Sequence, residues 1–133
     1  MSYKSIGFKP GEEKKIKYIA DMTGLTRTGV IRSILVTEFS QFDRENKDKN
    51  ELQMSFKKSE EGHLKTVTVM INDDILKKMK PYLDITELSY SSFIRALVIP
   101  VINMLYEDIK KNGVNDALRM AINSNIGKIG DIK

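Results

Sequence analysis

The feature that most constrains the fold of this chain is an internal repeat. Aligning Lys9 with Asn72 sets an offset of 63 residues, and the two copies then match without a gap. Apolar residues fall on apolar residues and hydroxyls on hydroxyls, as where Thr26 aligns with Ser89. Self-similarity at a fixed offset indicates that one supersecondary unit occurs twice.

Each copy begins with a segment of alternating apolar residues, as expected of a half-buried β-strand. In the second copy, residues 65–71 are rich in β-branched side chains, and Val67 and Ile71 lie on the same face. The first copy, residues 3–8, is a weaker strand because Lys4 takes the inward position that Val67 has in the second. The sequence therefore predicts one strand in each unit.

Two helices are predicted to follow each strand. Pro10 suits the first position of the first helix, and Gly24 suits the position just after its end. Asn72 is a favourable N-cap for the corresponding helix of the second copy, and Thr26 and Ser89 are N-caps for the second helix of each copy. Each unit thus reads strand, helix, helix.

Two prolines are predicted to disturb this pattern, because proline removes a helical hydrogen bond and clashes with the preceding turn. Pro81 is expected to kink its helix or end it early, and Pro100 to kink or break the last helix of the second unit. The chain then divides into a first unit, a charged helix extension and linker, a second unit and a C-terminal helical extension, at 1–42, 43–62, 63–100 and 101–133.

A single strand with two helices cannot bury its own apolar face, and an isolated two-stranded ribbon is only marginally stable. We therefore expect an α+β fold that is mostly α, in which the two units form an intramolecular pseudo-dimer around a two-stranded antiparallel ribbon, with C-terminal helices added. The shared core is predicted to hold Ile6, Phe8, Ile16, Ile19, Val30, Ile31, Ile34, Val67, Val69, Ile71, Met79, Phe93, Ile94 and Leu97.

Composition excludes several classes of function. Because the chain has no cysteine, disulfide scaffolds and thiolate metal sites are ruled out. It has one histidine and no catalytic motif, which argues against an enzyme, a cofactor or a metal site. No signal peptide or run of about 20 apolar residues is present, so a cytoplasmic location is expected, in a prokaryote or in the host cell of a virus. A net charge of +4 weakly favours a polyanionic partner.

The ribbon face that points away from the predicted core is narrow and mostly small and polar. The major groove of B-DNA admits a two-stranded β-ribbon, and short hydroxyl side chains there can bond base edges or touch thymine methyl groups. Candidate base-reading residues on this face are Tyr3, Ser5, Gly7, Thr66, Thr68 and Met70.

Residues 65–71 and 24–32 resemble the strand and the inter-helix turn of the ribbon-helix-helix transcriptional regulators, which include the Arc and methionine repressors. The resemblance covers residues 3–42 and 64–100. Most family members are homodimers of one unit, whereas this chain carries both halves. The tandem arrangement and the Lys- and Ile-rich, Cys-free composition are similar to those of regulators from archaeal viruses.

The resemblance implies that alternate strand residues read bases and that backbone N–H groups at the start of each second helix hold phosphates. The positive end of a helix dipole suits such a role. Gly7 and Met70 depart from the family, in which a basic or polar reader is common at these positions. The phosphate-binding residues implied are Thr26, Arg27, Thr28, Ser89, Tyr90 and Ser91.

The leading hypothesis is therefore a sequence-specific regulator that binds double-stranded DNA, with repression as the expected outcome. One alternative is an antitoxin whose C-terminal region binds a toxin protein. An alternative of another class is a protein-interaction module that binds no DNA. Self-association through the C-terminal helices is also expected, because Val114, Leu118, Ala121 and Ile122 form an apolar stripe.

Overall fold

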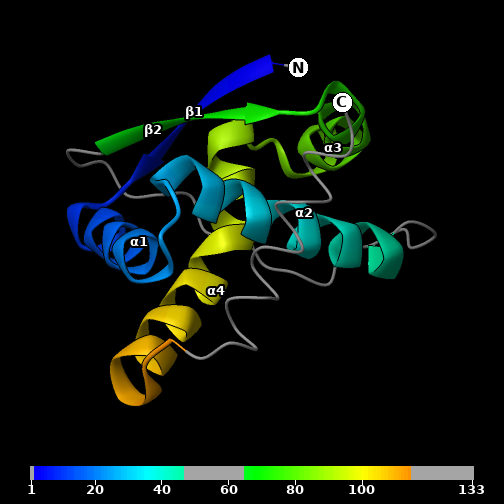
Figure 1. Ribbon diagram of the computed structural model, residues 1–133. Helices are drawn as coiled ribbons and strands as arrows, with labels where there is room; N and C mark the ends of the chain where they lie inside the picture. The colour runs from blue at the N-terminus through cyan, green and yellow to red at the C-terminus, as the bar shows by residue number, and fades with distance from the viewer. Residues whose placement is uncertain (1, 47–64, 115–133) are drawn as a thin grey trace.

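The computed structural model describes residues 2–46 and 65–114 as an α+β arrangement that is mostly helical (Figure 1). This agrees with the α+β, mostly helical class expected from the sequence. The elements, in chain order, are β1 (Ser2–Phe8), α1 (Pro10–Thr23), α2 (Arg27–Asn46), β2 (Lys65–Ile71), α3 (Asp73–Thr86) and α4 (Tyr90–Asn112).

Strands β1 and β2 pair antiparallel and form a ribbon that lies along one side of the helices (Figure 1). Ser5 lies opposite Thr68 at the middle of the ribbon, and Ser2 lies opposite Ile71 at one end. Ser5 and Thr68 are also the residues that the 63-residue offset aligns. Equivalent positions of the two copies therefore face each other at the ribbon centre.

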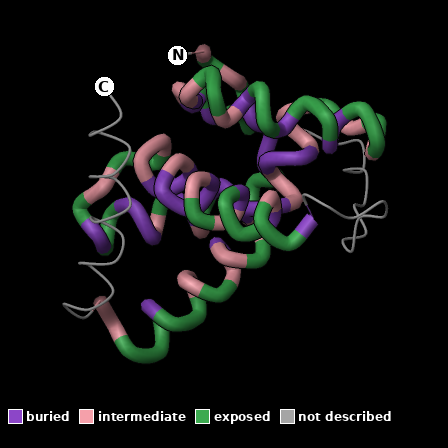
Figure 2. Tube along the Cα trace, turned by 90° about the vertical axis from the view of Figure 1, so that its right-hand side faces the viewer, coloured by how far each residue is buried: buried purple, intermediate pink, exposed green. Residues whose placement is uncertain are grey.

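Beneath the ribbon, both halves of the chain contribute to one apolar core (Figure 2). All fourteen residues predicted for the core are buried in it, which confirms that part of the sequence analysis. An aromatic cluster lies within this core: the ring of Phe93 is 5.5 Å from that of Phe42 and 6.3 Å from those of Phe39 and Tyr82. Residues from α2, α3 and α4 thus pack together.

The first helix of each copy ends in the same way. Gly24 has φ 77°, and its N–H donates to the carbonyl of Ala20. Glu87, the aligned position of the second copy, has φ 59°, and its N–H donates to the carbonyl of Leu83 over 2.8 Å. The left-handed conformation suits glycine and strains a residue with a Cβ, so the second copy keeps the turn at some cost in stability.

This strain leads to a prediction for Glu87→Gly. We expect the substitution to stabilise the fold by about 0.5–1 kcal/mol, because glycine adopts a positive φ without the steric penalty of a Cβ. Chemical denaturation of the wild type and the variant measures the difference. The control is Glu107→Gly in the exposed part of α4, where the same change is expected to destabilise by about 1 kcal/mol.

Neither proline ends its helix, so the predicted early end or break was wrong, while the alternative of a kink stays a prediction. α3 continues for five residues past Pro81 to Thr86, and α4 runs through Pro100 to Asn112. Both prolines are exposed, so each ring faces solvent. Each proline costs one backbone hydrogen bond, and the turns that follow are held by buried side chains, namely Tyr82, Leu83, Ile102 and Ile109.

Several predictions fall partly or wholly outside the described residues. The helix extension predicted after residue 42 is present as far as Asn46, and the rest of the linker lies outside. Of the C-terminal apolar stripe, only Val114 is described. Among the described residues no single helix is long and apolar enough to cross a membrane; α3 and α4 pass that test only together, and they are bent by 99° at their junction.

Candidate nucleic-acid interface

The outer face of the ribbon is open to solvent along most of its length. Ser5, Thr66 and Thr68 are exposed, and Tyr3 is 66% exposed. Met70 is half-buried, so only part of its side chain is accessible. The apolar residues between them, Ile6, Val67, Val69 and Ile71, point into the core. Five of the six candidate base-reading residues therefore present side-chain atoms on one narrow surface.

Gly7 is the exception among the six candidates. It is buried, and its N–H donates a hydrogen bond to Oγ of Ser91 over 3.0 Å. Lacking a side chain and with its amide engaged, Gly7 offers the outer face no donor. It instead ties β1 to the start of α4.

The centre of the ribbon carries a pair of hydroxyl groups. Oγ of Ser5 and Oγ1 of Thr68 lie 3.3 Å apart, and either group can donate. Each also keeps acceptor lone pairs, and hydroxyl hydrogens can rotate to suit a new partner. Nearby, Nζ of Lys4 lies 4.4 Å from the ring centroid of Tyr90, which explains how a lysine is accommodated on the inner face of β1.

Each edge of the ribbon is flanked by the N-terminus of a helix. At the β2 edge, Thr28 of α2 donates a hydrogen bond from Oγ1 to the carbonyl of Thr68 over 3.2 Å. At the β1 edge, Ser91 of α4 accepts from Gly7. The second helix of one copy thus contacts the strand of the other copy, and this exchange occurs in both directions.

The helix starts are capped as predicted. Oγ1 of Thr26 accepts from the N–H of Gly29 over 2.9 Å, and Oγ of Ser89 accepts from the N–H of Ser92 over 3.1 Å. The remaining N–H groups of a first helical turn have no acceptor within the helix. Both helix starts therefore combine free donors with a positive dipole end, beside an open polar ribbon.

Not every predicted phosphate-binding side chain is free. Nη1 of Arg27 donates to Oε1 of Glu13 over 2.6 Å, although half of the Arg27 side chain stays exposed. The hydroxyl of Tyr90 lies 3.5 Å from the carbonyl of Leu76, and the ring is half-buried. Arg27 therefore retains N–H donors for a ligand, whereas the Tyr90 side chain packs against the core.

Arg32 and Arg95 are aligned by the repeat but differ in their surroundings. Arg95 forms a two-point ion pair with Glu12, with Nη2 2.7 Å from Oε2 and Nε 3.1 Å from Oε1. Nε of Arg32 is buried and has no hydrogen-bond partner among the described residues. The aligned counterpart of Glu12 is Ile75, so the second copy has no carboxylate at that position.

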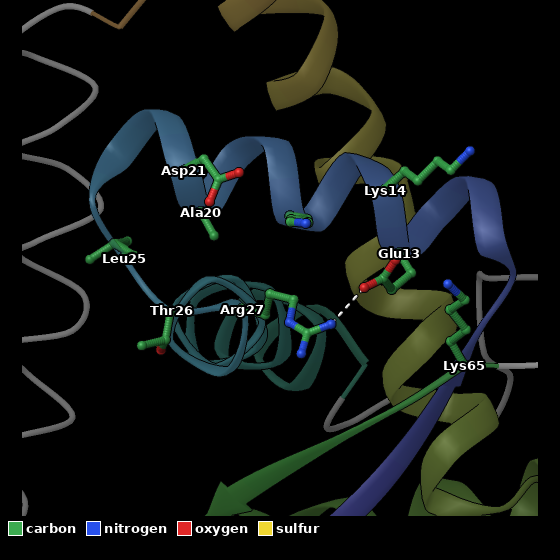
Figure 3. Close-up of a pocket in the computed structure, with 9 residues that line it drawn as sticks. Glu13, Lys14, Ala20, Asp21, Leu25, Thr26, Arg27 and Lys65 are labelled. Carbon is green, nitrogen blue, oxygen red and sulfur yellow. Dashed lines mark hydrogen bonds and ion pairs between the residues drawn. The ribbon is translucent and has the colours of Figure 1, made fainter.

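A hollow of about 590 Å³ lies where α1, the start of α2 and the start of β2 meet (Figure 3). Arg27 reaches across it toward Glu13, and the amine of Lys65 points to the same side (Figure 3). The site residues predicted from the sequence include Thr26 and Arg27 of this hollow but none of its three lysines. The hollow is lined by Glu13, Lys14, Lys17, Ala20, Asp21, Leu25, Thr26, Arg27 and Lys65.

One signal in the sequence points to these lysines. The motif Lys-Lys-X-Lys occurs at residues 14–17 and again at 77–80, at the same offset of 63. Its recurrence in both copies marks the outer face of each first helix as basic.

Among the described residues no group of three or more His, Cys, Asp or Glu is placed to hold a metal ion. Comparison of the chain with protein-family models, curated proteins and solved structures gives no match.

Proposed function

We propose that this chain is a sequence-specific regulator that binds double-stranded DNA by inserting its ribbon into the major groove. The observation that carries the proposal is the open polar face of the ribbon, flanked on each edge by a helix N-terminus. A major groove admits a two-stranded ribbon, and the phosphates of its two walls then lie beside the ribbon edges. No catalytic role is part of this proposal.

The proposal includes an intramolecular pseudo-dimer of the ribbon-helix-helix type. Three features support a pseudo-two-fold axis through the ribbon centre. Ser5 and Thr68, aligned by the repeat, face each other. The contacts of α2 with β2 and of α4 with β1 are exchanged between the copies. Gly24 and Glu87, also aligned, share a left-handed φ.

The exposed residues suit direct reading of bases. A threonine presents a hydroxyl that donates or accepts and a methyl group that can contact thymine. Thr66 and Thr68 offer both in one strand, while Tyr3 and Ser5 offer bulk and a short hydroxyl in the other. Because the two strands differ, we expect the site beneath one ribbon not to be palindromic.

The test begins with selection of a binding site from a random duplex library and continues with Thr68→Ala. We expect this variant to lose about 1 kcal/mol of discrimination at one base step, because it removes a hydroxyl and a methyl group from the centre of the ribbon. The measurement is the affinity for the selected duplex and for a scrambled duplex at several salt concentrations.

Thr37→Ala serves as the control, since Thr37 is an exposed threonine on α2, outside the ribbon. It should bind both duplexes as the wild type does. Equal losses on both duplexes for Thr68→Ala, or no loss on either, would show that the ribbon does not read bases. Binding without salt dependence would instead favour a protein-interaction module, because phosphate contacts release counterions.

A further inference from the structure

The hollow beside α2 carries an excess of positive charge. Four of its lining residues are cationic, Lys14, Lys17, Arg27 and Lys65, and two are carboxylates, Glu13 and Asp21. Glu13 is buried and already neutralised by Arg27. The cations come from three separate elements, so the fold concentrates charge that is scattered along the sequence.

The position of the hollow suits one wall of a DNA groove. It borders the start of α2, whose residue Thr28 contacts β2. Lys65 belongs to the inward-facing set of β2, so its amine extends past the end of the ribbon toward α1 (Figure 3). Lys17 of α1 and Lys65 of β2 thus line the same hollow as Arg27, which lies in the first turn of α2.

The aligned positions at the β1 edge do not repeat this charge. Lys14 and Lys17 correspond to Lys77 and Lys80, but Arg27 corresponds to Tyr90, which is half-buried under Lys4. Lys65 corresponds to Ser2. The β1 edge therefore keeps two of the four cations and has neutral side chains in place of the other two.

The first turns of α1 and α3 each carry two carboxylates, but at different positions. Asp73 and Asp74 begin α3 at positions where the first copy has Pro10 and Gly11. Oγ of Ser2 donates to Oδ1 of Asp73 over 2.8 Å, and this hydrogen bond lowers the pKa of the Asp73 carboxyl. Positive charges nearby, including that of Lys77, also lower this pKa, so the carboxylate is ionised at neutral pH.

We propose that the hollow of Lys17, Lys65 and Arg27 binds a phosphate of the DNA backbone, and that the β1 edge has no equivalent cation site among residues 2–46 and 65–114. The duplex is then held more strongly along the β2 edge than along the β1 edge. This inference rests on the proposed function and adds that the two edges of the ribbon bind the duplex unequally. A homodimer of identical units could not show such a difference, because both of its edges carry the same residues.

The repeat supplies a matched pair of variants for the test. Lys17→Gln removes one charge at the hollow, and Lys80→Gln removes the aligned, exposed charge at the other edge. The probe is a mixed-sequence duplex, because phosphate contacts do not depend on sequence. Affinity is measured over a series of salt concentrations.

We expect Lys17→Gln to weaken binding about fivefold at low salt and to lower the slope of log affinity against log salt by about 1. Lys80→Gln should stay within about twofold of the wild type and keep its slope. The double variant Lys17→Gln/Lys65→Gln should lose a further few-fold in affinity. Far-ultraviolet circular dichroism verifies that the variants remain folded.

Equal effects of Lys17→Gln and Lys80→Gln, or an unchanged slope for Lys17→Gln, would overturn the proposed asymmetry. If Thr68→Ala still loses discrimination in that case, the proposed function stands and only the asymmetry fails. If the wild type binds no duplex in a salt-dependent manner, both proposals fail together.

Discussion

Replacing Phe93 with alanine is expected to lower the free energy of unfolding by about 4 kcal/mol. The side chain is fully buried, and its ring contacts aromatic rings of α2 and α3. Truncation removes apolar contacts and leaves a cavity between elements of both copies, which the packed neighbours fill only in part. Urea denaturation measures the loss.

The control for this prediction is Tyr3→Ala, which also removes an aromatic ring, but one that is 66% exposed. Its effect on stability should stay below about 1 kcal/mol, since little area leaves the core. If the two units share one core, Phe93→Ala also lowers the stability of the first unit, so probes in both units report one transition. Separate transitions for the two copies would contradict the shared core.

The sequence was sufficient to predict most elements of the fold. Alternation over residues 65–71 gave β2 with the bounds that the structure has. The caps at Asn72 and Ser89 were predictable because short polar side chains satisfy the free N–H groups of a first turn, and both residues do so. The internal repeat supported the weaker predictions, because a weak pattern in one copy, such as the strand at residues 3–8, aligns with a strong pattern in the other.

The prolines mark the limit of local rules. A proline inside a helix costs a hydrogen bond in any context, but whether the helix ends depends on what the next turns bury. After Pro100, Ile102 and Ile109 are both buried in the core. The free energy that their burial contributes depends on the tertiary fold, and no sequence pattern around Pro100 alone reveals it.

The candidate site was predicted less fully than the fold. Exposure of Ser5 and Thr68 follows from strand alternation, so these residues could be named in advance. The burial of Gly7 could not, because it depends on where Ser91 lies, 84 residues away. The hollow likewise brings Lys17 together with Lys65, which follows it in the sequence only after the rest of the first unit and the linker. Contacts at such separations require the packed structure.

The largest functional effect is expected from Ser5→Glu. Ser5 lies at the ribbon centre, opposite Thr68, so a carboxylate there would enter the groove among base edges and between two rows of phosphates. Burying that charge without a partner and placing it near phosphates should weaken binding to any duplex by about 100-fold or more. Because the position is exposed in the free protein, stability should change little.

Ser40→Glu is the matched control, since Ser40 is an exposed serine on α2, about 20 Å of helix length from the start of that helix. Both variants lower the net charge by one, so long-range electrostatic repulsion weakens both to a similar, small extent. A loss of affinity in Ser5→Glu far beyond that in Ser40→Glu therefore reports the position of the charge. Duplex binding by Ser5→Glu at the level of Ser40→Glu would mean that DNA does not contact the ribbon, and a different surface would have to carry the function.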